Sequence, residues 1–178
     1  MDLRIVKTKQ QIKQAFLSLR AQYLPEKIKV KDICERAMIN KTTFYKHYVD
    51  SLALANEIEE SCIEKLMNTF SEKKSLFESP KAYVRGLLAA VEKQSEELRM
   101  VYKGRMDAFV AKLESKLMQA YDGNDDSTER RMTATFVTSG MAHVLGQWLL
   151  CEDGKRVDLG TIAAYMERLA GNMLPANT

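Results

Sequence analysis

The segment from Lys29 to Tyr48, KVKDICERAMINKTTFYKHY, constrains the fold of this chain more than any other stretch. Val30, Ile33 and Ala37 recur at helical spacing, which predicts a short helix from Val30 to Ala37 with one buried stripe. Met38 and Ile39 would then form a tight turn before a second helix. Two helices joined in this way are typical of the helix-turn-helix motif, in which the first helix crosses the DNA backbone and the second enters the major groove.

The second helix is predicted to begin at Asn40, whose side chain can cap it, and to continue to Tyr48 without a breaker. At about 100° per residue, Phe44 and Tyr48 share one face with His47 at its edge. The opposite face carries Thr42, Thr43 and Lys46, flanked by Lys41 and Tyr45. These hydroxyls and the ammonium group can donate to phosphates and to base acceptors, and threonine methyls can meet thymine methyls. An ordinary helical hairpin with a solvated charged face would show the same pattern.

The charge of the chain is unevenly distributed. Residues 1–50 contain eleven Lys and Arg against five Asp and Glu, whereas residues 51–178 contain 16 against 19, so a net charge of +3 conceals a basic end. Such an end can gain affinity for phosphates through counterion release, independent of base sequence. A chance excess of surface lysine is the alternative.

The first fifty residues resemble the DNA-binding domain of the tetracycline-repressor (TetR) family. The resemblance rests on the order and spacing of residues in three helices: Thr8, Ile12, Ala15, Phe16 and Leu19, then Val30, Asp32, Ile33 and Ala37, then Thr43, Phe44, Tyr45 and Tyr48. It implies that Tyr45 reaches a phosphate, that Thr42, Thr43, Lys46 and His47 lie in or beside the groove, and that Thr8 touches the backbone. Phe16, Ile33, Phe44 and Tyr48 would form the core. Together with the residues above, the predicted DNA contacts are Thr8, Lys29, Lys31, Asn40, Lys41, Thr42, Thr43, Tyr45, Lys46 and His47.

Three residues depart from the pattern of this family. Met38 stands where the family usually has Gly, so a side chain would occupy a turn that needs positive φ, at a cost of about 1 kcal/mol. Lys29 replaces the Ser or Thr that often caps the second helix, which removes a cap and adds a phosphate contact. Ser51 replaces a lysine that usually touches the DNA backbone.

The composition predicts an all-α protein. Of the 178 residues 46% are apolar, with only eight Gly and three Pro, and no β-rich block is present. No apolar run approaches the ~18 residues of a membrane span, and the N-terminus lacks a secretory signal, so we expect a cytoplasmic protein. Cys34, Cys62 and Cys151 are far apart, which favours free thiols over disulfides. We expect neither a metal site nor a cofactor.

Residues 51–178 are predicted to form a second, helical domain after the DNA-binding domain of residues 1–50. A long helix from Ser51 to about Phe70 would carry Leu52, Ala55, Ile58, Cys62 and Leu66 on one side. Further helices follow at about 81–95, through Leu98 and Tyr102, and at about 105–121, 128–151 and 159–173. The breaks between them are SEKKSLFESP, YDGNDDST and CEDGKRVD.

The last two helices are the most apolar, and they can form a four-helix seam with a second copy of the chain. A homodimer would place two reading helices about 34 to 36 Å apart on a palindromic operator, and the TetR resemblance implies the same dimer. In the other interpretation these helices only complete the core of the monomer.

The second domain is also a candidate for binding a small apolar effector, as is common in this family. The predicted lining is Tyr102, Met106, Phe109, Phe136, Met141, His143 and Trp148, with Tyr83 and Leu87 nearby. Met and aromatic side chains suit an adaptable cavity, yet the same stripe is also typical of a core. The domain could instead answer to a protein partner or have lost its ligand.

The sequence thus predicts a DNA-binding transcriptional regulator, with repression released by an effector as the expected mode. An enzyme of the helical-bundle type is not favoured, because Glu-x-x-His, a Gly-rich phosphate loop and a neighbouring Cys and His pair are all missing from the sequence. A helical adaptor with an incidental basic surface remains the alternative.

Overall fold

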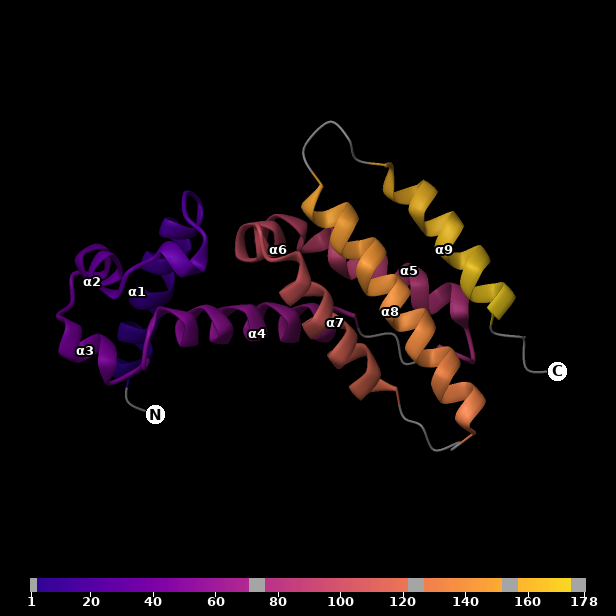
Figure 1. The fold of residues 1–178 in the computed structure, drawn as a ribbon, viewed down its shortest axis with the longest axis horizontal. Helices are drawn as coiled ribbons and strands as arrows, with labels where there is room; N and C mark the ends of the chain where they lie inside the picture. Colours follow the sequence, from indigo (N-terminus) through magenta and orange to yellow (C-terminus); the bar gives the residue numbers. More distant parts are fainter. Residues whose placement is uncertain (1–2, 71–75, 122–126, 152–156, 174–178) are drawn as a thin grey trace.

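The computed structural model describes residues 3–70, 76–121, 127–151 and 157–173, and within these ranges it contains nine α-helices and one 3-10 helix (Figure 1). The elements are α1 (Leu3–Arg20), η1 (Pro25–Lys27), α2 (Val30–Ala37), α3 (Lys41–Tyr45), α4 (Ser51–Thr69), α5 (Pro80–Lys93), α6 (Ser95–Tyr102), α7 (Met106–Ala120), α8 (Thr128–Leu150) and α9 (Leu159–Met173). The all-α prediction is confirmed. The centres of the three predicted breaks, at 71–75, 122–126 and 152–156, lie outside the described residues.

Helices α1, α2 and α3 gather at one end of the molecule, and α4 leads from them to the remaining helices (Figure 1). We call residues 3–50, with α1, η1, α2 and α3, the head, and α5 to α9 the core. Helix α4 lies against both parts, because it contacts α1 and η1 on one side and α5, α6 and α7 on the other. The end of α1 also meets α6 directly.

The interior of the head is formed by the residues that the sequence assigned to it. Phe16, Ile33, Phe44 and Tyr48 are all buried, and the ring centroids of Phe44 and Tyr48 lie 5.8 Å apart. The cysteine prediction also holds for Cys34 and Cys62, which are buried free thiols.

Helix α3 is shorter than predicted. It ends at Tyr45 rather than at Tyr48, because the amide of His47 donates to the carbonyl of Phe44 at 2.9 Å and tightens the chain into a turn. Asp50 then starts α4 by accepting a 2.7 Å hydrogen bond from the amide of Ala53. The placement of Leu52 on the buried side of α4 was wrong, because this side chain is 44% exposed in the first turn of the helix.

The turn between α2 and α3 has the strained geometry predicted from its sequence. Met38 adopts φ 52° and ψ 45°, the left-handed conformation. The amide of Ile39 donates to the carbonyl of Cys34 at 3.0 Å, and that of Met38 to Glu35 at 3.3 Å, which together end α2 as a Schellman motif. Met38 therefore holds a position that glycine fills at lower cost.

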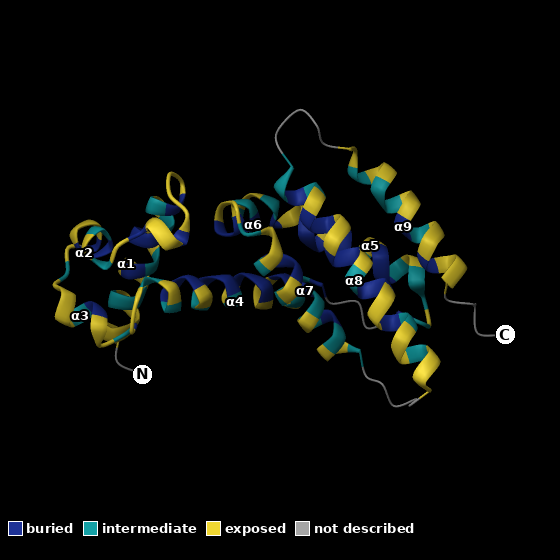
Figure 2. Ribbon diagram, in the orientation of Figure 1, coloured by how far each residue is buried: buried dark blue, intermediate teal, exposed yellow. Residues whose placement is uncertain are grey.

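Helix α8 has two apolar sides. One side packs on α7, and here the approach is close, since a Cβ atom on Gly146 would lie 2.9 Å from a methyl carbon of Val110. The other side leaves Met132 and Phe136 each 67% exposed, so buried and exposed stretches alternate along the helix (Figure 2). Among the described helices none is both long and apolar enough to cross a membrane.

Candidate nucleic-acid interface

The N-cap of α3 fixes the start of the helix that the sequence predicts to contact DNA. The Oδ1 atom of Asn40 accepts a hydrogen bond from the amide of Thr43 at 2.7 Å, which confirms Asn40 as the N-cap. Because Oδ1 is occupied in this way, Asn40 has its amide group left for a second partner. The cap also determines where the helical face begins, and with it the direction of the side chains that follow.

The two faces of α3 differ as the helical spacing predicted. Lys41, Thr42, Tyr45 and Lys46 are exposed, whereas Thr43 and His47 are half-buried and Phe44 is fully buried. The ring of Tyr45 meets that of Phe44 edge to face, with centroids 5.6 Å apart. The outward surface thus combines two cations, a phenol and a hydroxyl on a helix whose back is anchored in the core of the head.

The predicted contacts outside α3 have different surroundings. Thr8 is half-buried and its hydroxyl donates to the carbonyl of Arg4 at 2.9 Å. Lys29 is exposed and precedes α2 without a side-chain cap, as expected from the missing Ser or Thr. Lys31 is exposed and its ammonium lies 3.6 Å from a carboxylate oxygen of Glu35, a surface pair that leaves the lysine accessible.

Some basic side chains of the head form ion pairs within the protein. Lys9 and Lys13 lie 3.2 and 2.9 Å from the carboxylate of Glu57 on α4, and the hydroxyl of Tyr48 donates to the same carboxylate at 3.2 Å. Burial raises the pKa of Glu57, but the hydrogen bonds and charges of Lys13 and Lys9 outweigh it, so the net shift is downward. The count of lysines therefore overstates the charge offered to DNA. The sequence does not reveal this cluster, because Lys9 and Lys13 lie more than forty residues from Glu57.

The predicted effector residues fall into different environments. Tyr102 and Phe109 are buried against each other with ring centroids 5.2 Å apart, and the hydroxyl of Tyr102 donates to the carbonyl of Glu59 at 2.8 Å. Met141 is buried, Trp148 is half-buried and Met106 is exposed. Phe136 and His143 lie on the outer face of α8, where they line an open pocket of about 710 Å³ with Arg131, Met132 and Ser139. The residues that the sequence grouped are thus divided between core and surface.

Comparison with known proteins gives a likeness in structure. No protein-family model matches the chain, and no curated protein matches its sequence. The crystal structure of a TetR transcriptional regulator from Streptococcus agalactiae 2603V is similar, with a TM-score of 0.65 and 22% identity over 94% of this chain and 95% of that one. The chain adopts the TetR fold.

Two further structures with lower scores support the same fold. The dihydroxyacetone kinase operon activator DhaS matches with a TM-score of 0.56 and 16% identity over 94% of this chain and 96% of its own. The fatty acid degradation regulator FadR from Bacillus halodurans matches with a TM-score of 0.50 and 17% identity over 96% of this chain and 97% of its own. The TetR fold therefore extends over both the head and the core.

Proposed function

We propose that this protein is a homodimeric, sequence-specific DNA-binding regulator, with residues 1–50 as reading head and residues 51–178 as the dimerisation and effector domain. The observation that carries the proposal is the outward face of α3, where Lys41, Thr42 and Lys46 are exposed beside an Asn40 cap. A helix with its aromatic back buried and its polar front exposed is the element that helix-turn-helix proteins insert into the major groove.

The residues have distinct roles in this proposal. Lys29, Lys31, Lys41 and Tyr45 contact phosphates, with Thr8 on the backbone from α1. Thr42, Thr43, Lys46 and His47 face base edges, where ammonium and hydroxyl groups distinguish bases by their acceptors. We propose repression as the mode of action, relieved by an effector.

The exposed side of α8 and α9 is the proposed dimer interface. Val144, Leu169 and Met173 are exposed there together with Phe136, and they line a groove between the two helices. Within one chain, a Cβ atom on Gly140 would meet nothing within 4 Å, so a helix of a second chain can approach closely at this point. A continuous apolar surface of this kind is typical of an interface rather than of a monomer surface.

The pocket on the outer face of α8 is where we propose that a small effector binds. Its volume of about 710 Å³ lies within the roughly 300 to 1,000 Å³ usual for small-molecule sites. Arg131 and His143 supply polar groups, and Met132 and Phe136 supply apolar surface. Because Phe136 and Gly140 belong both to the pocket and to the proposed interface, a bound molecule would alter how two copies meet.

The test of DNA reading is selection of bound fragments from random duplexes, followed by affinity measurements on the selected site. We expect a palindrome, and we expect Lys46→Ala to weaken binding by about 1 to 3 kcal/mol if it reads a base. Lys81→Ala is the matched control, since Lys81 is an exposed lysine on α5. Failure to enrich any sequence, together with an affinity that does not change with salt, would instead support a protein-binding adaptor.

The dimer is tested in the same assay. Phe136→Glu places a charge in the proposed seam, and it should shift the protein to monomers and the selected DNA from palindromes to single half-sites. If the variant remains dimeric in analytical ultracentrifugation, this face is not the interface.

A further inference from the structure

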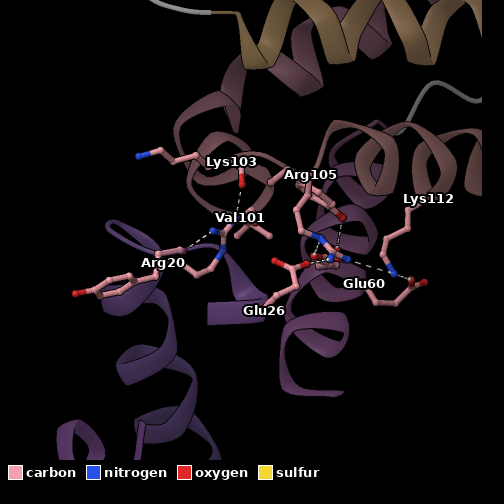
Figure 3. A network of polar contacts seen from close by, with 10 residues as sticks. Arg20, Glu26, Glu60, Val101, Lys103, Arg105 and Lys112 are labelled. Carbon is pink, nitrogen blue, oxygen red and sulfur yellow. Dashed lines mark hydrogen bonds and ion pairs between the residues drawn. The ribbon is translucent and has the colours of Figure 1, made fainter. Parts of the chain in front are cut away.

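The C-terminal ends of α1 and α6 face each other at the junction between head and core (Figure 3). Arg20, the last residue of α1, is 1% exposed. Its Nη2 atom donates to the carbonyls of Val101 at 2.9 Å and Lys103 at 2.8 Å, and its Nη1 atom donates to the carbonyl of Tyr23 at 2.8 Å. One guanidinium group thus joins backbone from both sides of the junction.

The contact is reciprocal. The ammonium of Lys103, just after α6, donates to the carbonyl of Ala21, just after α1, at 3.4 Å. The last carbonyls of a helix lack partners within the helix and attract cations. Here each helix end receives a cation from the other, so separating the two ends would leave carbonyls on both sides without partners.

A second set of charges holds the same junction. Arg105, just before α7, lies 2.7 Å from Glu26 of η1 and 3.0 Å from Glu59 of α4. Glu59 is 1% exposed, and Lys112 lies 3.9 Å from its carboxylate. Burial alone would lower the pKa of Arg105, yet attraction from Glu59 and Glu26 raises it overall. The ion pairs therefore join η1 of the head to α4 and to the start of α7.

Gly104 adds a close fit between these charges. Its φ is +69°, and a Cβ atom built on it would lie 2.5 Å from a methyl carbon of Leu24. Leu24 therefore rests directly on the turn after α6.

A buried arginine contributes little net folding stability, because desolvation offsets much of its attraction to its partners. It fixes the relative orientation of the segments that it joins, because the planar guanidinium group offers several donors in a fixed geometry. The head cannot rotate about the start of α4 without breaking bonds from Arg20 to Val101 and Lys103.

We propose that Arg20 is a positioning residue that fixes the direction of each reading head relative to the core, and so determines which spacing of DNA half-sites the dimer accepts. The inference rests on the proposed function. Arg20 is buried in the junction, so its effect on DNA passes through the orientation of the head and requires no contact with bases.

The experiment compares affinities for the selected palindrome with its spacer unchanged, lengthened or shortened by one base pair. Each change rotates one half-site by about 35° and shifts it by about 3.4 Å relative to the other. A head held in one direction then loses base contacts, at roughly 10-fold or more per base pair missed. We expect this penalty in the wild type and a penalty of about 3-fold or less in Arg20→Met, because a loosened head can follow its half-site.

Two further variants distinguish a change in the orientation of the head from a loss of folding stability. Arg20→Lys retains the charge without the planar set of donors and should also reduce the penalty. Arg85→Met removes an exposed arginine that pairs with Glu167, and it should keep the wild-type penalty. Destabilisation alone would lower affinity for all spacers equally, so equal penalties in wild type and Arg20→Met would overturn the proposal. Affinity for a single half-site should not change in any of the three variants.

A second measurement needs neither DNA nor a dimer. Spin labels at the exposed positions 27 and 81, introduced by Lys27→Cys and Lys81→Cys in a Cys151→Ser background, report the distance from head to core within one chain. The labelled chains are diluted into unlabelled protein. We expect a narrow distance distribution that Arg20→Met broadens, and an unchanged distribution would overturn the proposal. A narrow distribution that broadens in the variant, in a protein that selects no DNA, would refute the proposed function but leave Arg20 as the residue that orients the head.

Discussion

Replacing Met38 by glycine should stabilise the protein, although it removes a large side chain. Met38 has φ 52°, and a residue with a Cβ atom in this conformation loses roughly 1 to 2 kcal/mol relative to the right-handed region. Glycine avoids that strain but loses more conformational freedom on folding, which costs roughly 0.5 to 1 kcal/mol. The Met38 side chain is 89% exposed, so its removal gives up little buried surface.

The balance predicts a gain of about 0.5 to 1 kcal/mol in the free energy of unfolding for Met38→Gly. In a protein of this size it corresponds to an increase of about 1 to 4 °C in Tm. Denaturation by urea, followed by circular dichroism at fixed protein concentration, measures the change. The concentration must be fixed because the proposed dimer would make stability depend on it.

Met38→Ala is the matched control. It shortens the side chain but keeps a Cβ atom at the same φ, so we expect a change within about 0.5 kcal/mol of zero. If Met38→Ala stabilised the protein as much as Met38→Gly, side-chain exposure and not backbone strain would be the cause. A loss of stability in Met38→Gly would refute the reasoning outright.

Two other predictions concern the head. Asn40→Ala should lower the free energy of unfolding by about 1 kcal/mol through loss of the α3 cap, whereas Asn40→Asp should retain most of it; equal losses would show that the 2.7 Å bond to Thr43 contributes nothing. Because the pKa of Glu57 is lowered in the folded protein, its pairs stabilise the fold above about pH 4.5 and are lost as the pH falls through the folded pKa. Glu57→Gln should therefore be less stable than wild type by about 0.5 kcal/mol at pH 7, with thermal melts that converge once the pH falls below the folded pKa of Glu57, and a difference independent of pH would contradict this.

The bounds of most helices could be predicted from sequence because the signals that determine them are local. Asn40, the apolar spacing of α2 and the dense polar breaks all act within a few residues of the element they define. The end of α3 could not be predicted, because residues 46–48 include no helix breaker. The helix is shortened by the turn that leads to the N-cap of α4 at Asp50. The burial of Leu52 was mispredicted for a related reason. Periodicity identifies the apolar face of a helix, but it does not show how far along the helix that face is covered by other residues.

The outward face of α3 was predictable because, once the first residue of a helix is known, the helical spacing determines which residues share a face. The junction around Arg20 was not, because the acceptors that join it to the core are main-chain carbonyls more than eighty residues away, and a carbonyl is present whatever the amino acid. The lining of the proposed effector pocket depends on tertiary placement in the same way. Phe136 and Tyr102 are both aromatic residues at helical spacing, yet one lies on the surface and the other in the interior.

The choice of carbonyls as acceptors has a consequence for substitutions. Any amino acid that fits the buried position 101 presents the same carbonyl oxygen to Arg20, whereas position 103 also supplies the ammonium group that donates to Ala21. The side chains that the junction constrains are therefore the two donors, Arg20 and Lys103. A substitution of similar size at position 101 should therefore leave the orientation of the head relative to the core unchanged.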